Sequence, residues 1–251
     1  MVAVSHSVLV HAVPYDWFGG IVAVLVELAE DSRAENGRIL LPDGKEAEGV
    51  RLVTGRHLRR GARYSVADES ATCLVTVKEW DRRRTLRAVG DVEHPEGRMT
   101  WEAALRGTDR PRRAEAKGEA QFTGTPRMLS AWAGSVRLRF DDWWAAAGGE
   151  PDAHSAPLRI RLRGKPVQAE IRAVPRPSED GHWLVEVTLT GRGRGLLRPL
   201  LALVLPLSRR RLQLGLAQAL DSLADGWNEH LPPALELDRD ALREEILRQD
   251  F

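Results

Sequence analysis

The most unusual short segment of the chain combines two adjacent carboxylates with two adjacent tryptophans, Asp141-Asp142-Trp143-Trp144. Paired carboxylates at the end of a strand can bind a cation or transfer protons. The same residues fit the first turn of a helix, where Asp141 or Asp142 would cap the backbone and Gly148-Gly149 would end the helix. We favour the helix start over the cation site.

Other catalytic signatures are absent from the sequence, including HExxH, GxSxG, CxxC and P-loop motifs. The segment Gly191-Arg192-Gly193-Arg194-Gly195 lacks the GxGxxG spacing and predicts a flexible bend. His6 and His11 differ in parity, so on one strand they point to opposite faces and cannot share a metal. We therefore predict no metal and no cofactor, and we assign no catalytic residue.

The composition is that of an ordinary globular protein, with 251 residues of which 43% are hydrophobic and 29% charged. Because 37 basic residues face 36 acidic ones, the net charge of +1 gives no general attraction for nucleic acid. The single cysteine, Cys73, excludes an internal disulfide. No Lys or Arg precedes Arg33 and no uncharged apolar run is long enough for a membrane span, so we expect a cytoplasmic protein.

Apolar and polar residues alternate repeatedly between about residues 38 and 190, and such alternation predicts antiparallel strands with one buried face. The segments between them at 106–118 and 145–157 are predicted loops. The last three strands are expected to form a meander. The alternating runs are Cys73 to Val77, Met99 to Leu105, Val136 to Phe140, Leu158 to Leu162, Val167 to Ala173, and Trp183 to Leu189.

Both ends of the chain predict helices. A short apolar run, Ser7 to Val13, predicts a strand before a helix that Asp16 can cap, although a second strand there is an alternative. Near the C-terminus, apolar residues recur at spacings of three and four and predict a helix from Arg209 to Leu231 that Pro232-Pro233 stops. That apolar stripe consists of Leu212, Leu216, Leu220, Leu223 and Trp227.

The order of strand, helix, many antiparallel strands and one long helix resembles the helix-grip fold of the START/Bet v 1-like (SRPBCC) superfamily, which includes polyketide cyclase-like and lipid-carrier proteins. The matching segments are Val8 to Pro14, before a helix with Trp17, and Val185 to Pro199, before the long helix. The resemblance implies an α+β fold in which a curved antiparallel sheet wraps the C-terminal helix. It suggests one domain at 1–235, enlarged at about 105–157, and a short helix or tail at 236–251.

A helix-grip fold implies an apolar cavity between the sheet and the C-terminal helix. We therefore predict a protein that binds a hydrophobic or amphiphilic small molecule, with Arg137 as a polar anchor. Aromatic residues that only fill a core are the alternative. The expected lining residues are Trp101, Phe140, Trp143, Trp144, Trp183, Leu216, Leu220 and Trp227.

Two other functions stay open. One is an enzyme similar to polyketide cyclases, and the other is an interaction protein that docks through the basic apolar segment 192–211. No acidic residue occurs between Glu186 and Asp221, a composition that suits peripheral contact with an anionic membrane, or a buried helix with basic ends. The arginines of this segment are Arg192, Arg194, Arg198, Arg209, Arg210 and Arg211.

Overall fold

The computed structural model describes residues 1–67, 71–126, 128–149, 156–179, 181–195 and 207–248. The chain divides into two compact units. Unit 1 comprises Met1–Val13 and Thr125–Ala234, and unit 2 comprises Pro14–Gly124 and Leu235–Phe251. Each unit combines antiparallel strands with helices, so the predicted α+β class is confirmed.

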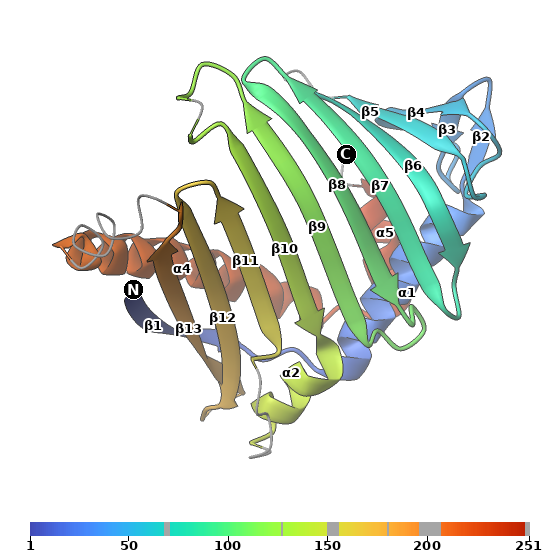
Figure 1. Cartoon of the computed structure of the whole chain (residues 1–251). Coiled ribbons are helices and arrows are strands. Elements are labelled where there is room, and N and C mark those ends of the chain that lie inside the picture. The colour runs from blue at the N-terminus through green and yellow to red at the C-terminus, as the bar shows by residue number, and fades with distance from the viewer. Residues whose placement is uncertain (68–70, 127, 150–155, 180, 196–206, 249–251) are drawn as a thin grey trace. The chain divides into compact units, whose positions relative to one another are not determined.

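Unit 1 contains an antiparallel sheet in the order β1-β13-β12-β11-β10 (Figure 1). Its strands are β1 (Val2–His11), β10 (Ala131–Arg139), β11 (Leu158–Gly164), β12 (Val167–Pro177) and β13 (His182–Gly193). Among its described residues the unit also contains the helices α2 (Phe140–Ala147) and α4 (Arg209–Leu235). The meander predicted for the last three strands is confirmed, because β11 pairs with β12 and β12 with β13.

The first strand of the chain pairs with the last one along its whole length. In this antiparallel pair Val8 lies opposite Val185, and Val4 lies opposite Leu189. Alternate residues of a strand point to opposite faces, and here one face is buried while the other carries exposed residues such as Ser5. Val4, Val8 and Val185 belong to the buried face, which forms the core of unit 1.

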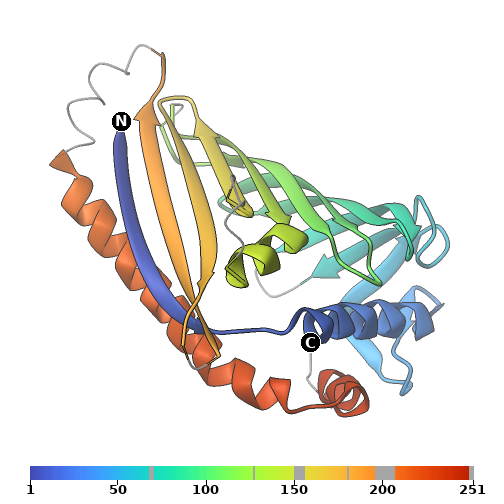
Figure 2. The same ribbon diagram turned by 90° about the horizontal axis from the view of Figure 1, so that it is seen from below.

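Helix α4 runs alongside β1 (Figure 2). The Asn228 side chain accepts a hydrogen bond from the His11 N–H at 2.7 Å and donates one to the Leu9 carbonyl at 2.9 Å. Asp221 accepts from His6 Nε2 at 2.7 Å. The amide of Asn228 thus satisfies the edge of β1 as a neighbouring strand would, which protects an edge that otherwise invites pairing with another chain. This helix-grip-like arrangement of an antiparallel sheet and a long C-terminal helix confirms the predicted fold class.

Three details of the predicted helix ends are wrong. Helix α4 continues to Leu235, because proline at 232 and 233 keeps a helix-compatible φ and removes N–H groups only from the last turn. Pro14 is the N-cap of α1 (Tyr15–Asp31), so Asp16 lies inside the first turn. Arg139 occupies the N-cap of α2, and neither Asp141 nor Asp142 does. Asp142 instead pairs with Arg139 at 2.7 Å.

Unit 2 contains a second antiparallel arrangement, in the order β9-β8-β7-β6-β5-β4-β3-β2. Its strands are β2 (Arg33–Glu35), β3 (Arg38–Leu40), β4 (Glu46–Thr54), β5 (Arg63–Ala67), β6 (Thr72–Asp81), β7 (Thr85–His94), β8 (Gly97–Arg106) and β9 (Arg113–Phe122). The helices are α1 and α5 (Arg239–Arg248), which lie close together. Strand β9 occupies part of the loop predicted at 106–118, because its inward residues are alanine and glycine and give a weak apolar signal.

One carboxylate holds the two helices of unit 2 and the β6–β7 turn together. Glu27 of α1 accepts hydrogen bonds from Arg82, at 2.7 Å, and from Arg239 of α5. Arg82 also bonds Asp109 at 3.0 Å. Hydrogen bonds from Arg239 and Arg82 hold the pKa of the Glu27 carboxyl below its usual value. The ionised form of Glu27 therefore stabilises the folded unit.

Replacing Asn228 by alanine removes both hydrogen bonds at the β1 edge. We expect Asn228→Ala to lower the free energy of unfolding by about 1–2 kcal/mol, because two backbone groups lose their partner. Urea denaturation measures the change. Gln218→Ala, an exposed change on the same helix, is the control, and an equal loss in both variants would contradict the edge-capping role.

The Glu27→Gln variant tests the ion pairs of Glu27 with Arg82 and Arg239 through the pH dependence of the stability. The folded-state pKa of Glu27 is lowered, so its stabilisation is complete above about pH 4.5 and disappears as the pH falls through the folded-state pKa. We expect the variant to lose about 1 kcal/mol at pH 7 and to approach the wild type in acid. Glu35→Gln, which breaks an exposed pair with Arg33, should change stability much less. A Glu27→Gln deficit that persists undiminished at pH 3 would refute this role.

Candidate functional site

Trp101 lies flat against the unit 2 sheet, with its indole over Gly90 of the neighbouring strand β7. Trp101 pairs with Gly90 of β7 on one side and with Gly118 of β9 on the other. A Cβ atom added to Gly90 would lie 2.3 Å from Trp101 Cε2, and one added to Gly118 would lie 3.4 Å from Trp101 Cβ. The indole therefore occupies the space that a side chain at 90 would fill, whereas a Cβ at 118 would first meet the Thr100 carbonyl oxygen at 2.7 Å.

A row of apolar residues crosses five strands beside Trp101. The register places Val66, Cys73, Val92, Met99 and Ala120 opposite one another, from β5 to β9. Because Met99 and Trp101 are two residues apart, this row faces the same side as the indole. We call this row, together with Trp101 and Phe122, the Trp101 surface.

The Trp101 surface is half-exposed, unlike an ordinary core. Met99 is 42% exposed, Val66 39% and Phe122 46%, while Trp101, Cys73 and Val92 are intermediate. Contiguous exposed apolar residues usually mark a binding site for a ligand or partner. The surface offers a hydrophobic molecule a flat aromatic ring with aliphatic and thioether neighbours.

The core of unit 2 lies toward the other ends of the strands. Ile39, Ala62, Tyr64 and Val77 form a buried cluster, and Trp80 packs against it. Trp80 Nε1 also donates to Glu30 of α1 at 3.1 Å, which places α1 near this end of β6. The helix thus covers one part of the apolar face and leaves the row from Val66 to Ala120 half-exposed.

Four of the predicted lining residues meet in unit 1 as a packed aromatic cluster. The Trp183 ring centroid lies 6.1 Å from that of Trp143 and 5.8 Å from that of Trp144, both in edge-to-face geometry. Phe140 is buried with its centroid 6.3 Å from that of Trp144. Trp144 Nε1 donates to the Val13 carbonyl at 2.7 Å. These contacts fit α2 packing on β12, the alternative that aromatic residues fill a core.

The predicted stripe on α4 is only partly buried. Ala224 and Leu231 are buried, Leu216 and Leu220 are intermediate, and Leu223 is 70% exposed. The polar contacts of Asp221 and Asn228 with β1 fix which side of α4 faces the sheet. Trp227 shares them, since its Nε1 donates to the His11 carbonyl at 3.0 Å. The predicted anchor Arg137 lies on β10 opposite Arg159.

Most of the predicted basic docking segment falls outside the described residues, including Arg198 and all of 196–206. Arg194 closes the end of β13, where its Nη1 donates to the Gly164 carbonyl at 3.1 Å. Arg192 is exposed on the same strand, and Arg209, Arg210 and Arg211 are exposed in the first turn of α4. Membrane contact through these arginines stays a prediction.

A chain of hydrogen bonds runs through His57, and no motif in the sequence indicates it. The Tyr64 hydroxyl accepts from the Leu58 N–H at 2.8 Å and donates to His57 Nδ1 at 2.9 Å. His57 Nε2 then donates to Ser32 Oγ at 3.0 Å, and Ser32 donates to the Ala29 carbonyl at 2.7 Å. Burial raises the pKa of the Tyr64 hydroxyl, which keeps its proton. The Tyr64 hydroxyl, the His57 Nε2–H and the Ser32 hydroxyl each already donate a hydrogen bond, so no free base is placed to activate Ser32 as a nucleophile. These hydrogen bonds instead hold the 56–62 loop.

In the described part of the chain, no three His, Cys, Asp or Glu side chains gather as metal ligands would. Nor is any helix there long and apolar enough to cross a membrane. No family model, curated protein or solved structure matches the chain.

The contact between Gly90 and Trp101 is testable by adding a single methyl group. We expect Gly90→Ala to lower stability by about 1–3 kcal/mol, because its Cβ overlaps the indole and forces Trp101 off the sheet. A red shift of the tryptophan emission should accompany the loss. Gly134→Ala is the control, since a Cβ there meets Leu162 at 3.4 Å, an ordinary contact. Equal behaviour of the two variants would contradict the described position of the indole.

Proposed function

We propose that the protein binds a hydrophobic or amphiphilic small molecule, and that the Trp101 surface provides the binding site. The single observation that supports this is the row of half-exposed apolar residues beside a tryptophan that lies flat on the sheet. A large aromatic ring contributes contact area with little loss of side-chain freedom, because the ring already lies flat on the sheet over Gly90.

We also propose distant kinship with the START/Bet v 1-like superfamily. Its support is topological: β1 is followed by α1, then by antiparallel strands in sequence order, and the last strand returns to pair with β1 before α4. Proteins of that fold enclose apolar ligands, which agrees with the proposed function.

The cavity predicted between the sheet and α4 remains a second place to test. Leu216 and Leu220 are only partly buried, which leaves apolar area on that helix. Against it, Val8, Val185 and Val187 are buried on the unit 1 sheet. The Trp101 surface is therefore the site that we propose first. No specific observation favours the cyclase-like enzyme.

Titration with a fluorescent fatty acid tests the proposed site. We expect Trp101→Ala to weaken binding about fivefold or more, since losing one aromatic contact costs about 1 kcal/mol. Trp132→Ala is a matched control, because Trp132 also lies against a glycine of the adjacent strand, Gly164, but belongs to unit 1. Equal weakening in both variants, or no binding to the wild type, would refute the proposal.

The only cysteine of the chain provides a second readout at the same place. Cys73 lies in the row beside Trp101 and is partly exposed, so it accepts an environment-sensitive thiol dye. We expect the dye emission to shift to the blue when the fatty acid binds. Fatty-acid binding without any dye response would place the ligand elsewhere, for example against α4.

A further inference from the structure

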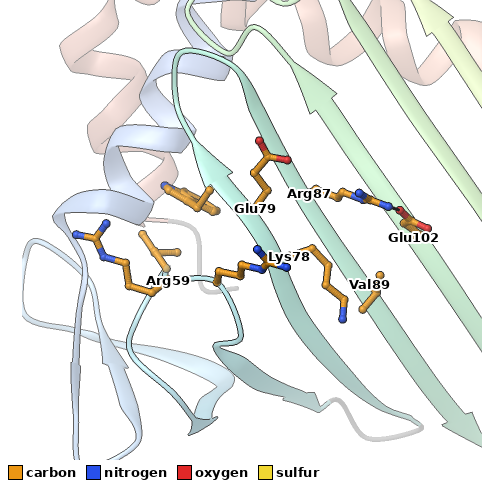
Figure 3. A pocket seen from close by; sticks show the side chains of 9 residues that line it. Arg59, Lys78, Glu79, Arg87, Val89 and Glu102 are labelled. Atoms are coloured by element: carbon orange, nitrogen blue, oxygen red, sulfur yellow. Dashed lines mark hydrogen bonds and ion pairs between the residues drawn. The ribbon is translucent and has the colours of Figure 1, made fainter.

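A pocket of about 740 Å³ opens in unit 2, on residues that the proposed fatty-acid site does not use (Figure 3). Val89 and Glu102, which line it, precede Gly90 and follow Trp101, so they point to the face opposite the Trp101 surface. Its volume falls in the range that small-molecule sites occupy. The lining residues are Leu58, Arg59, Arg60, Lys78, Glu79, Trp80, Arg87, Val89 and Glu102.

A β-bulge places Lys78 in this pocket. The register between β6 and β7 shifts after Val77, which pairs with Ala88, and resumes at Glu79, which pairs with Arg87. Lys78 is thus an extra residue with no partner in that ladder. Bulges redirect side chains and are common beside binding sites. Figure 3 shows Lys78 and Val89 between Arg59 on one side and the Arg87–Glu102 pair on the other.

The pocket carries an excess of positive charge. Four cationic side chains and two carboxylates line it. Glu102 is already paired with Arg87, and with Lys117 from outside the pocket at 2.8 Å. Hydrogen bonds from Lys117 and Arg87 lower the pKa of Glu102, which keeps that carboxylate ionised and engaged. Among the residues that the structure describes, Arg59, Arg60 and Lys78 form no ion pair.

The loop that supplies Arg59 and Arg60 is held in an uncommon conformation. Leu58 has a φ of 53°, in the left-handed region that branched side chains avoid. The hydrogen bond from the Leu58 N–H to Tyr64, and the His57 chain behind it, hold this conformation. Backbone strain of this kind is concentrated at functional sites, where the surrounding structure fixes it.

We propose that this pocket binds a phosphate-bearing small molecule. Two guanidinium groups and an ammonium group suit phosphate oxygens, since arginine donates paired hydrogen bonds and lysine adds a point charge. Val89 and Leu58 offer apolar contact to the rest of the molecule. The pocket would recognise the phosphate group itself, which either a soluble metabolite or a lipid headgroup can carry. The proposal does not depend on the fatty-acid site.

Calorimetric titration of the full chain with inorganic pyrophosphate tests this pocket at low ionic strength. We expect Lys78→Met and Arg60→Met each to weaken binding about tenfold, because both remove a charge that faces the anion. Arg51→Met is the matched control: it removes one exposed positive charge from β4, outside the pocket, and should change binding less than twofold. Trp101→Ala should leave pyrophosphate binding unchanged.

Phosphatidylcholine vesicles containing phosphatidic acid form the second arm of the experiment. Pyrophosphate binding that depends on Lys78 supports a soluble phosphate ligand. Vesicle binding that depends on Lys78, without pyrophosphate binding, supports a lipid headgroup. The proposal is overturned if neither probe binds, or if Lys78→Met and Arg51→Met weaken binding equally, since general surface charge would then explain the attraction. Because Lys78 and Arg60 are exposed, unchanged thermal unfolding should confirm that these variants fold.

Discussion

The architecture of unit 1 depends on the pairing of the first strand with the last. Ten residues of β1 align with β13, although their neighbouring ends, His11 and His182, are separated by most of the chain. Closing so long a loop is entropically unfavourable, and each further doubling of its length adds only about 0.6 kcal/mol. The valines of the buried face, among them Val4, Val8, Val185 and Val187, provide the apolar burial that offsets this cost. The Asn228 side chain then forms hydrogen bonds with backbone groups at the outer edge of β1, so helix α4 covers this edge of the sheet.

A mismatch in size explains why unit 2 leaves apolar surface exposed. A strand of ten residues, such as β7 or β8, is about 33 Å long. A helix with its side chains is about 10 Å wide, so one helix covers about a third of that length. Helix α1 packs near the Val77 end, and α5 has no buried residue. The row from Val66 to Ala120 lies beyond what α1 covers within this unit. Apolar strands longer than their covering helix leave room for a ligand without any special cavity.

Sequence patterns predicted the elements best where polarity alternated strongly. The strands β11, β12 and β13 follow from arginine and glutamate alternating with leucine, isoleucine and valine. Trp101 was predicted to line a ligand site, and the register places it on the same face as Met99 and the half-exposed row. Strand β9 was missed because Ala114, Ala116 and Gly118 contrast little with their neighbours. The stripe predicted on α4 is only partly buried, because its leucines form a pattern that does not reveal which face Asp221 and Asn228 bring to β1. No spacing rule could join Ser32, His57 and Tyr64, since a loop and a helix end bring them together.

The bulge at Lys78 links the two faces of the unit 2 sheet. Without an extra residue, the alternation of Cys73, Val75 and Val77 would point Trp80 toward the polar face. The register resumes at Glu79 opposite Arg87, so Trp80 pairs with Leu86 and returns to the apolar side. One inserted residue therefore seats Trp80 against the buried cluster and puts Lys78 and Glu79 together on the polar side. The packing of Trp80 holds the bulge in place, and the bulge sets the position of the Lys78 backbone. The bulge thereby sets where the Lys78 side chain leaves the backbone, on the side of the sheet where the proposed phosphate pocket lies.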